Sequence, residues 1–135
     1  MREQIPFDWA EYLKLAQELG ARTDEASLRS AASRAYYYVY HLALQRAESN
    51  DFQIRSGEGT HTQLWRCFSA NPEPDCQRLA QIAGRLKEKR ERADYNHYFA
   101  RIDEEVPSLL ADAQRFALLL SRINPRHPNQ RSQRQ

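Results

Sequence analysis

The chain has 135 residues, which suffices for one domain with a single modest core and argues against a second catalytic domain. Its 20 lysines and arginines against 18 aspartates and glutamates give a net charge of +2, so total charge does not mark a nucleic-acid binder. An apolar content of 41% with seven tyrosines and two tryptophans is typical of a globular protein and excludes a disordered chain.

Cysteine spacing and hydropathy argue against several further classes of protein. Cys67 and Cys76 form no C-x-x-C pair, and no clustered set of histidine, cysteine and carboxylate appears, so we expect no disulfide framework and no metal. No glycine-rich nucleotide fingerprint is present, and we expect no cofactor. The first residues lack an apolar core of a signal peptide, and the longest aliphatic run, near residues 116–120, is too short to span a bilayer. We therefore expect a soluble cytoplasmic protein with no membrane partner.

Apolar residues recur at helical spacing along most of the chain, and no segment alternates with the period of a strand. The first predicted helix spans residues 7–19 and stops at Gly20. A longer helix follows, with Thr23 or Asp24 as its N-cap, and it extends to about Glu48.

The second half of the chain continues the same pattern. A polar, turn-rich loop at residues 49–60 precedes a short helix at about residues 61–68. After a break at residues 71–74, Asp75 is the expected N-cap of the next helix. The last amphipathic helix carries its apolar positions from residue 106 and ends near residue 123.

These elements predict an all-α bundle of four to five helices over residues 1–123. The remainder, residues 124–135, has no core-forming residues, and we expect a disordered basic tail. Arg126, Arg131 and Arg134 would then be available for nonspecific contacts to polyanions.

Four tyrosines crowd the middle of the long helix. Tyr36, Tyr37, Tyr38 and Tyr40 cannot share one helical face, because consecutive residues point about 100° apart. At least two faces are therefore aromatic. Either the rings pack in the core with their hydroxyls reaching water, or one face packs in the core and another faces a partner.

The stretch Arg85 to Phe99 is the strongest candidate for a functional site. The apolar stripe of its helix continues through Arg90, Ala93 and His97, so a buried face turns cationic near its end. Guanidinium groups match phosphate oxygens and imidazole titrates near neutral pH, which makes this a reasonable place to receive a phosphate.

A second interpretation of the same stretch is an ordinary solvated helix. Opposite charges four residues apart stabilise exposed helical faces in many proteins. Three such pairs occur here: Lys87 with Glu91, Glu88 with Arg92, and Arg90 with Asp94. Spacing alone therefore does not decide between a site and a surface.

Three segments resemble the HEPN family of small all-helical proteins found in prokaryotic toxin–antitoxin pairs and in RNA-cleaving defence systems. R-S-A-A-S-R-A-Y-Y-Y-V-Y-H, residues 29–41, resembles the long second helix of uncharacterised small HEPN proteins. R-E-R-A-D-Y-N-H, residues 90–97, resembles the later helix that carries the Arg-x4-6-His element of the family. G-T-H-T-Q-L-W-R-C-F, residues 59–68, resembles the short helix between them, so the resemblance covers about residues 7–123.

The resemblance implies a homodimer in which the Arg/His elements of two protomers face each other in one cleft. Catalytic members are metal-independent endoribonucleases that leave a 2′,3′-cyclic phosphate and a 5′-hydroxyl. Carried over, His97 takes the acid/base role, and either Arg92 or Arg90 stabilises the charge on the phosphoryl oxygens. The substrate-binding residues would be their neighbours Asp94, Tyr95, Asn96 and Tyr98.

The chain departs from the active pattern of the family. Active members commonly place Asn, Asp or His directly after the arginine, whereas Ala93 follows Arg92 and Glu91 follows Arg90. On an unbroken helix Arg90 and His97 share a face, while Arg92 and His97 lie about 140° apart. Helical geometry therefore favours Arg90, unless the helix unwinds before the histidine.

The other polar residues of these segments have simpler interpretations. The A-D-Y triplet recurs in the family with or without a nearby histidine, so we expect Asp94 to pair with Arg34 of the Tyr-rich helix. We expect His61 to lie in the first turn of the short helix rather than to act as a ligand. We expect His41 to contact a partner or nothing, and His127 to lie in the tail.

The sequence thus predicts a HEPN-type protein that binds RNA and cleaves it as a toxin or defence ribonuclease, with an antitoxin as a possible partner. Two alternatives stay open. One is a noncatalytic HEPN subunit that binds a nucleotidyltransferase or another protein, and the other is a nucleotide-binding regulator that uses the same cationic cleft.

Overall fold

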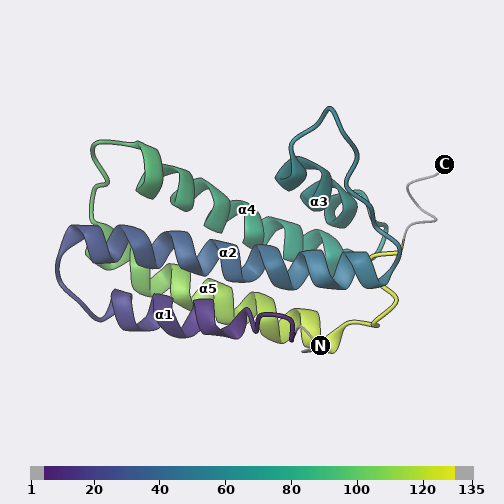
Figure 1. The fold of residues 1–135 in the computed structure, drawn as a ribbon, viewed down its shortest axis with the longest axis horizontal. Coiled ribbons are helices and arrows are strands. Elements are labelled where there is room, and N and C mark those ends of the chain that lie inside the picture. Colours follow the sequence, from purple (N-terminus) through teal and green to yellow (C-terminus); the bar gives the residue numbers. More distant parts are fainter. Residues whose placement is uncertain (1–4, 130–135) are drawn as a thin grey trace.

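The computed structural model describes residues 5–129, which form five packed α-helices and no strand (Figure 1). The helices are α1 (Ala10–Gly20), α2 (Glu25–Ser49), α3 (Thr60–Ser69), α4 (Pro74–Tyr95) and α5 (Ile102–Arg122). The predicted all-α architecture is confirmed for this part of the chain. Within it, no helix combines the length and the apolar character that crossing a membrane requires.

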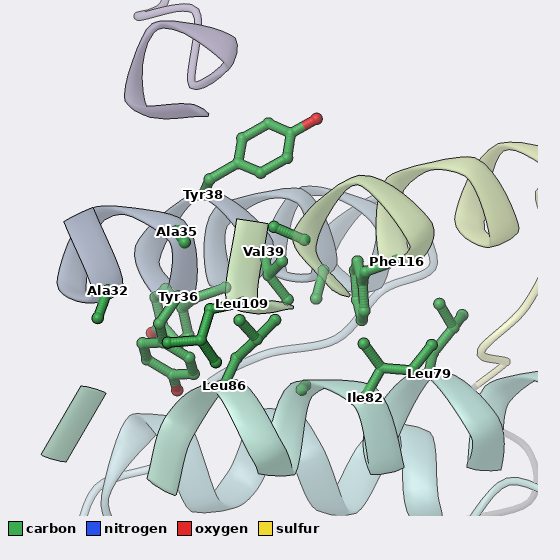
Figure 2. Close-up of a cluster of buried hydrophobic side chains, with 14 of the residues drawn as sticks. Ala32, Ala35, Tyr36, Tyr38, Val39, Leu79, Ile82, Leu86, Leu109 and Phe116 are labelled. Atoms are coloured by element: carbon green, nitrogen blue, oxygen red, sulfur yellow. The ribbon is translucent and has the colours of Figure 1, made fainter. Parts of the chain in front are cut away.

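The long helix α2 is the centre of the bundle, because it contacts all four other helices. Small residues on its buried side, Ala31, Ala32 and Ala35, let the neighbouring helices approach closely. Figure 2 shows Tyr36 of α2 directed toward α4, whereas Tyr38 points away from α4. The core between α2, α4 and α5 contains Val39, Leu79, Ile82, Leu86, Leu109 and Phe116.

The predicted N-cap of α2 is confirmed, whereas that of α4 is not. Asp24 is the N-cap of α2, and its carboxylate accepts hydrogen bonds from the backbone N–H and the hydroxyl of Ser27 at 3.0 and 2.8 Å. The predicted cap of α4 was wrong: Glu73 is the N-cap, while Asp75 lies in the first turn after Pro74. Helix α5 begins at Ile102, four residues before the first apolar position predicted for it.

The segment after α5 lies against the bundle as far as residue 129. Pro128 is fully buried, and the Arg46 guanidinium donates hydrogen bonds to the carbonyls of Leu120 and His127 at 2.9 and 3.2 Å. The Asn50 side chain donates to the Pro125 carbonyl at 3.0 Å. The first part of the predicted disordered tail is therefore ordered, because the side chains of Arg46 and Asn50 on α2 donate hydrogen bonds to its carbonyls. Arg131 and Arg134 of that tail lie outside the described residues.

Candidate functional site at the end of α4

Helix α4 ends before it reaches the predicted histidine. Tyr95 is its last residue, and Asn96 has extended backbone angles of φ −87° and ψ 138°. His97 therefore lies in the loop to α5 and is exposed, whereas Arg90 and Ala93 are buried. The expected continuation of the buried stripe to His97 was wrong, because the helix unwinds one turn too early for it.

One side chain from α2 holds this unwound end in place. Arg29 donates hydrogen bonds from Nη1 to the carbonyls of Ala93 and Asn96 at 3.0 and 2.6 Å, and from Nη2 to the carbonyl of His97 at 3.1 Å. A longer bond of 3.4 Å reaches the carbonyl of Arg92. The last carbonyls of a helix have no partner within the helix, and a cation at this end also interacts favourably with the helix dipole. Arg29 of α2 therefore caps the C-terminal end of α4.

The side chains at this capped end of α4 are exposed to solvent. Arg92 and His97 are both exposed, and the Arg92 guanidinium donates to the Glu88 carboxylate at 2.8 Å along the helix. Tyr95 and Tyr98 are 75% and 90% exposed, which is unusual for rings of this size. Asn96 between them is exposed as well. A guanidinium, an imidazole and two phenol rings are thus accessible on the last turn of α4 and the loop that follows it.

Arg90 is positioned differently, because its side chain turns toward α2 and is 9% exposed. The guanidinium carbon lies 5.1 Å from the ring centre of Tyr36 and 5.5 Å from that of Tyr37. The nearest carboxylate is that of Asp94, whose Oδ2 lies 3.8 Å from Nη1. Arg90 Nε is buried and has no hydrogen-bond partner within residues 5–129. Arg90 therefore keeps most of its donors unused next to two aromatic rings.

The predicted partner of Asp94 was wrong. Besides its contact with Arg90, the Asp94 carboxylate accepts a hydrogen bond of 3.4 Å from the Ser33 hydroxyl. Arg34 instead lies over the ring of Tyr12, with 5.1 Å between the guanidinium carbon and the ring centre. Arg34 leaves α2 on the side of α1, so helix geometry separates it from the end of α4.

A hydrogen-bonded aromatic network adjoins Arg90 and was not predicted from the sequence. The Trp65 indole donates to the Tyr36 hydroxyl at 3.0 Å, and the Tyr36 hydroxyl is hydrogen-bonded to Nδ1 of His61. An indole can only donate, so the phenol oxygen accepts from Trp65 and its proton has Nδ1 as acceptor. This arrangement leaves the proton of a neutral His61 on Nε2. A histidine and a tryptophan four residues apart on α3 were the signal in the sequence.

Burial shifts the titration of this network. Burial raises the pKa of Tyr36 far above that of a free phenol. Burial, together with the positive charges of Arg90 and Lys87, lowers the pKa of His61, so its imidazole is neutral at pH 7. His61 therefore acts as a hydrogen-bond donor rather than as a cation at this pH.

Residues 5–129 form an all-α bundle of five helices, with cationic and aromatic side chains accessible at the end of α4. Comparisons with protein-family models, with curated proteins and with solved structures find no match to the chain. Within residues 5–129, no three histidine, cysteine, aspartate or glutamate side chains are grouped so that they could hold a metal ion. Cys67 and Cys76 are both buried in this part of the chain.

Proposed function

We propose that this chain is a HEPN-type RNA-binding protein and that it cleaves RNA without a metal ion, as a toxin or defence ribonuclease acting as a homodimer. One observation carries the proposal. Arg29 holds the backbone of Arg92 and His97 at a single helix end, with Tyr95 and Tyr98 exposed beside them. Guanidinium groups bind phosphate, and exposed aromatic rings stack on unpaired bases, so the loop suits single-stranded RNA.

The roles follow from the exposure of each side chain. His97 accepts the proton of a ribose 2′-hydroxyl as its oxygen attacks the adjacent phosphorus, and the bond from phosphorus to the 5′-oxygen breaks. The leaving oxygen takes a proton, which gives a 2′,3′-cyclic phosphate and a 5′-hydroxyl. Arg92 stabilises the charge on the phosphoryl oxygens, since it is accessible whereas Arg90 is buried against Asp94. Tyr95, Asn96 and Tyr98 contact the flanking bases.

The test is incubation of purified protein with single-stranded RNA in excess chelator, followed by analysis of the cut ends. Wild-type protein should leave cyclic-phosphate ends. His97→Ala should reduce the cleavage rate by at least about 100-fold, and Arg92→Gln by a similar factor. Arg78→Gln is the matched control, because Arg78 is another exposed arginine of α4 whose one ion pair within residues 5–129 is with Asp75, and it should cleave normally.

Two results would contradict the proposal. Cleavage that persists in purified His97→Ala protein belongs to a contaminant or to another residue. Cleavage that the chelator abolishes requires a metal ion, which the proposed mechanism does not use.

The exposed tyrosines also favour a second candidate, a noncatalytic subunit that binds a nucleotidyltransferase or another protein. Large exposed aromatic rings such as Tyr95 and Tyr98 are enriched at protein interfaces. This candidate is preferred if wild-type protein leaves RNA intact and forms a complex with a co-expressed partner that Tyr98→Ser dissociates.

A further inference from the structure

A continuous series of aromatic and imidazole rings crosses the bundle from α1 over α2 to α3, and we name it the aromatic band. Its members are Phe7, Trp9, Tyr12, Tyr37, Tyr40, His41 and His61. Trp9 stacks on His41 with 3.3 Å between ring centres, His41 packs edge-on against Tyr40 at 5.1 Å, and Tyr40 stacks on His61 at 4.3 Å. Tyr37 completes the band, 6.1 Å from His61.

One face of α2 carries the middle of the band and remains partly accessible. Arg34, Tyr37 and His41 are three and four residues apart, so they lie on the same face of the helix. All three are half-buried, whereas Tyr36 and Tyr40 on the neighbouring face are buried. The Tyr-rich segment therefore has a core face and an accessible face.

Arg34 and Arg90 each lie against a ring of the band, and of the two only Arg34 is accessible. Arg34 lies over Tyr12, and within residues 5–129 it has neither an ion pair nor a hydrogen bond. Arg90 lies over Tyr37, and in the same part of the chain it makes no hydrogen bond and has only the 3.8 Å contact with Asp94. A guanidinium has five N–H donors, and those of Arg34 have no acceptor in this part of the chain. His61, which stacks on Tyr40, adds the N–H donor of its Nε2.

We propose that the aromatic band is a binding surface for single-stranded RNA. Phosphates accept hydrogen bonds from Arg34 and from Nε2 of His61, and bases stack against Tyr37 and the neighbouring rings. Unpaired bases supply aromatic faces and phosphates supply acceptors, which together match rings that lie beside an accessible guanidinium without an acceptor. An apolar protein face would supply no acceptor and would bury Arg34 without a partner.

The inference rests on the proposed function, because the band leads to the end of α4. Arg29 and Tyr37 lie eight residues apart on α2, which is about 12 Å along a helix. A strand cut at His97 therefore passes over the band within a few nucleotides. The band would hold the flanking strand, and the loop at the end of α4 would act on the scissile bond.

Binding is measured by fluorescence anisotropy with a labelled 12-nucleotide RNA, in a His97→Ala background that keeps the RNA intact. Arg34→Gln and Tyr37→Ala should each raise the Kd about tenfold. Arg34→Gln should also reduce the slope of log K against log salt by about 0.7, the value for one lost phosphate contact to a single strand. Tyr37→Phe keeps the ring and should bind normally, as should Arg78→Gln, whose arginine lies three turns from Arg90 on α4. Thermal melting of each variant verifies its fold.

Cleavage assays with the His97-containing protein distinguish the role of the band in binding from the role of the α4 end in cleavage. Arg34→Gln should lower kcat/KM about tenfold on the 12-nucleotide RNA and leave cleavage of a dinucleotide unchanged. Unaltered affinity in folded Arg34→Gln and Tyr37→Ala proteins would overturn the band and leave the proposed cleavage standing. Binding that depends on both residues without any cleavage would support the band and refute the cutting activity.

Two further outcomes would overturn the proposed RNA-binding surface. Wild-type protein that binds no RNA would overturn the band and the proposed function together. If sedimentation shows that Arg34→Gln and Tyr37→Ala convert a dimer to a monomer, the band is a contact between two copies of the chain and the RNA surface is overturned.

Discussion

His61 and His41 make the stability of this protein dependent on pH. Burial lowers the pKa of both imidazoles in the folded protein, and positive neighbours lower that of His61 further. Protonation of His61 would also remove the acceptor of the Tyr36 hydroxyl proton. As pH falls through about 6.5, the usual pKa of histidine, the unfolded chain binds protons that the folded chain does not. The free energy of unfolding should therefore decrease below about pH 6.5.

The contribution of His61 is measured with His61→Asn, whose amide oxygen can replace Nδ1 as an acceptor for Tyr36. Urea unfolding of the variant between pH 8 and pH 5 should lose less stability on acidification than wild type. The carboxyl group of Asp24, whose pKa is lowered by its bonds to Ser27, acts in a separate window below about pH 4. An identical loss of stability in variant and wild type between pH 7 and pH 5 would show that His61 is not the titrating group.

At the scale of helices, two glycines occupy opposite environments. A Cβ atom added to Gly84 in the exposed middle of α4 would meet nothing within 4 Å. A Cβ atom on Gly20 at the end of α1 would lie 2.9 Å from Cδ1 of Leu110 and 3.2 Å from Cγ1 of Val106, both on α5. Gly84→Ala should therefore stabilise the protein by about 0.5–1 kcal/mol, because alanine loses less entropy in a helix. In Gly20→Ala the displacement of α5 side chains should cancel or reverse this gain.

Thermal and urea unfolding of the two glycine variants measure this difference directly. Each variant is the control for the other, since both change the same atoms within a helix. Equal stabilisation of both would mean that α1 and α5 do not approach closely at Gly20.

The helices themselves could be predicted from the sequence, but the end of α4 could not. Periodicity located every helix, and Asp24 was recognised as a cap because local capping depends on residues three apart. The end of α4 depends on Arg29, more than sixty residues away in sequence, so no local pattern contains it. For the same reason the partners of Asp94 and the order of the segment before residue 129 were missed. The candidate residues are neighbours in the sequence, whereas the burial of Arg90 and the exposure of Arg92 and His97 depend on the tertiary structure.

In the whole molecule, the central helix α2 connects the end of α4 with the aromatic band. Arg29, near the start of α2, holds the loop at the end of α4, and Tyr37, two turns later, carries the middle of the aromatic band. A net charge of +2 provides little long-range attraction for a polyanion, so the proposed RNA binding requires these local contacts. In the proposed homodimer, the ends of the two α4 helices share one cleft.

A mixing experiment tests whether one protomer supplies the imidazole and the other supplies the guanidinium. His97→Ala and Arg92→Gln proteins are each inactive alone under the proposed mechanism. After subunit exchange about half of the dimers are mixed, and one of the two sites in each has both groups if the groups come from different protomers. The mixture should then regain about a quarter of the wild-type cleavage rate. No recovery, despite exchange verified by native mass spectrometry, would mean that Arg92 and His97 of the same chain work together, as their common attachment to Arg29 permits.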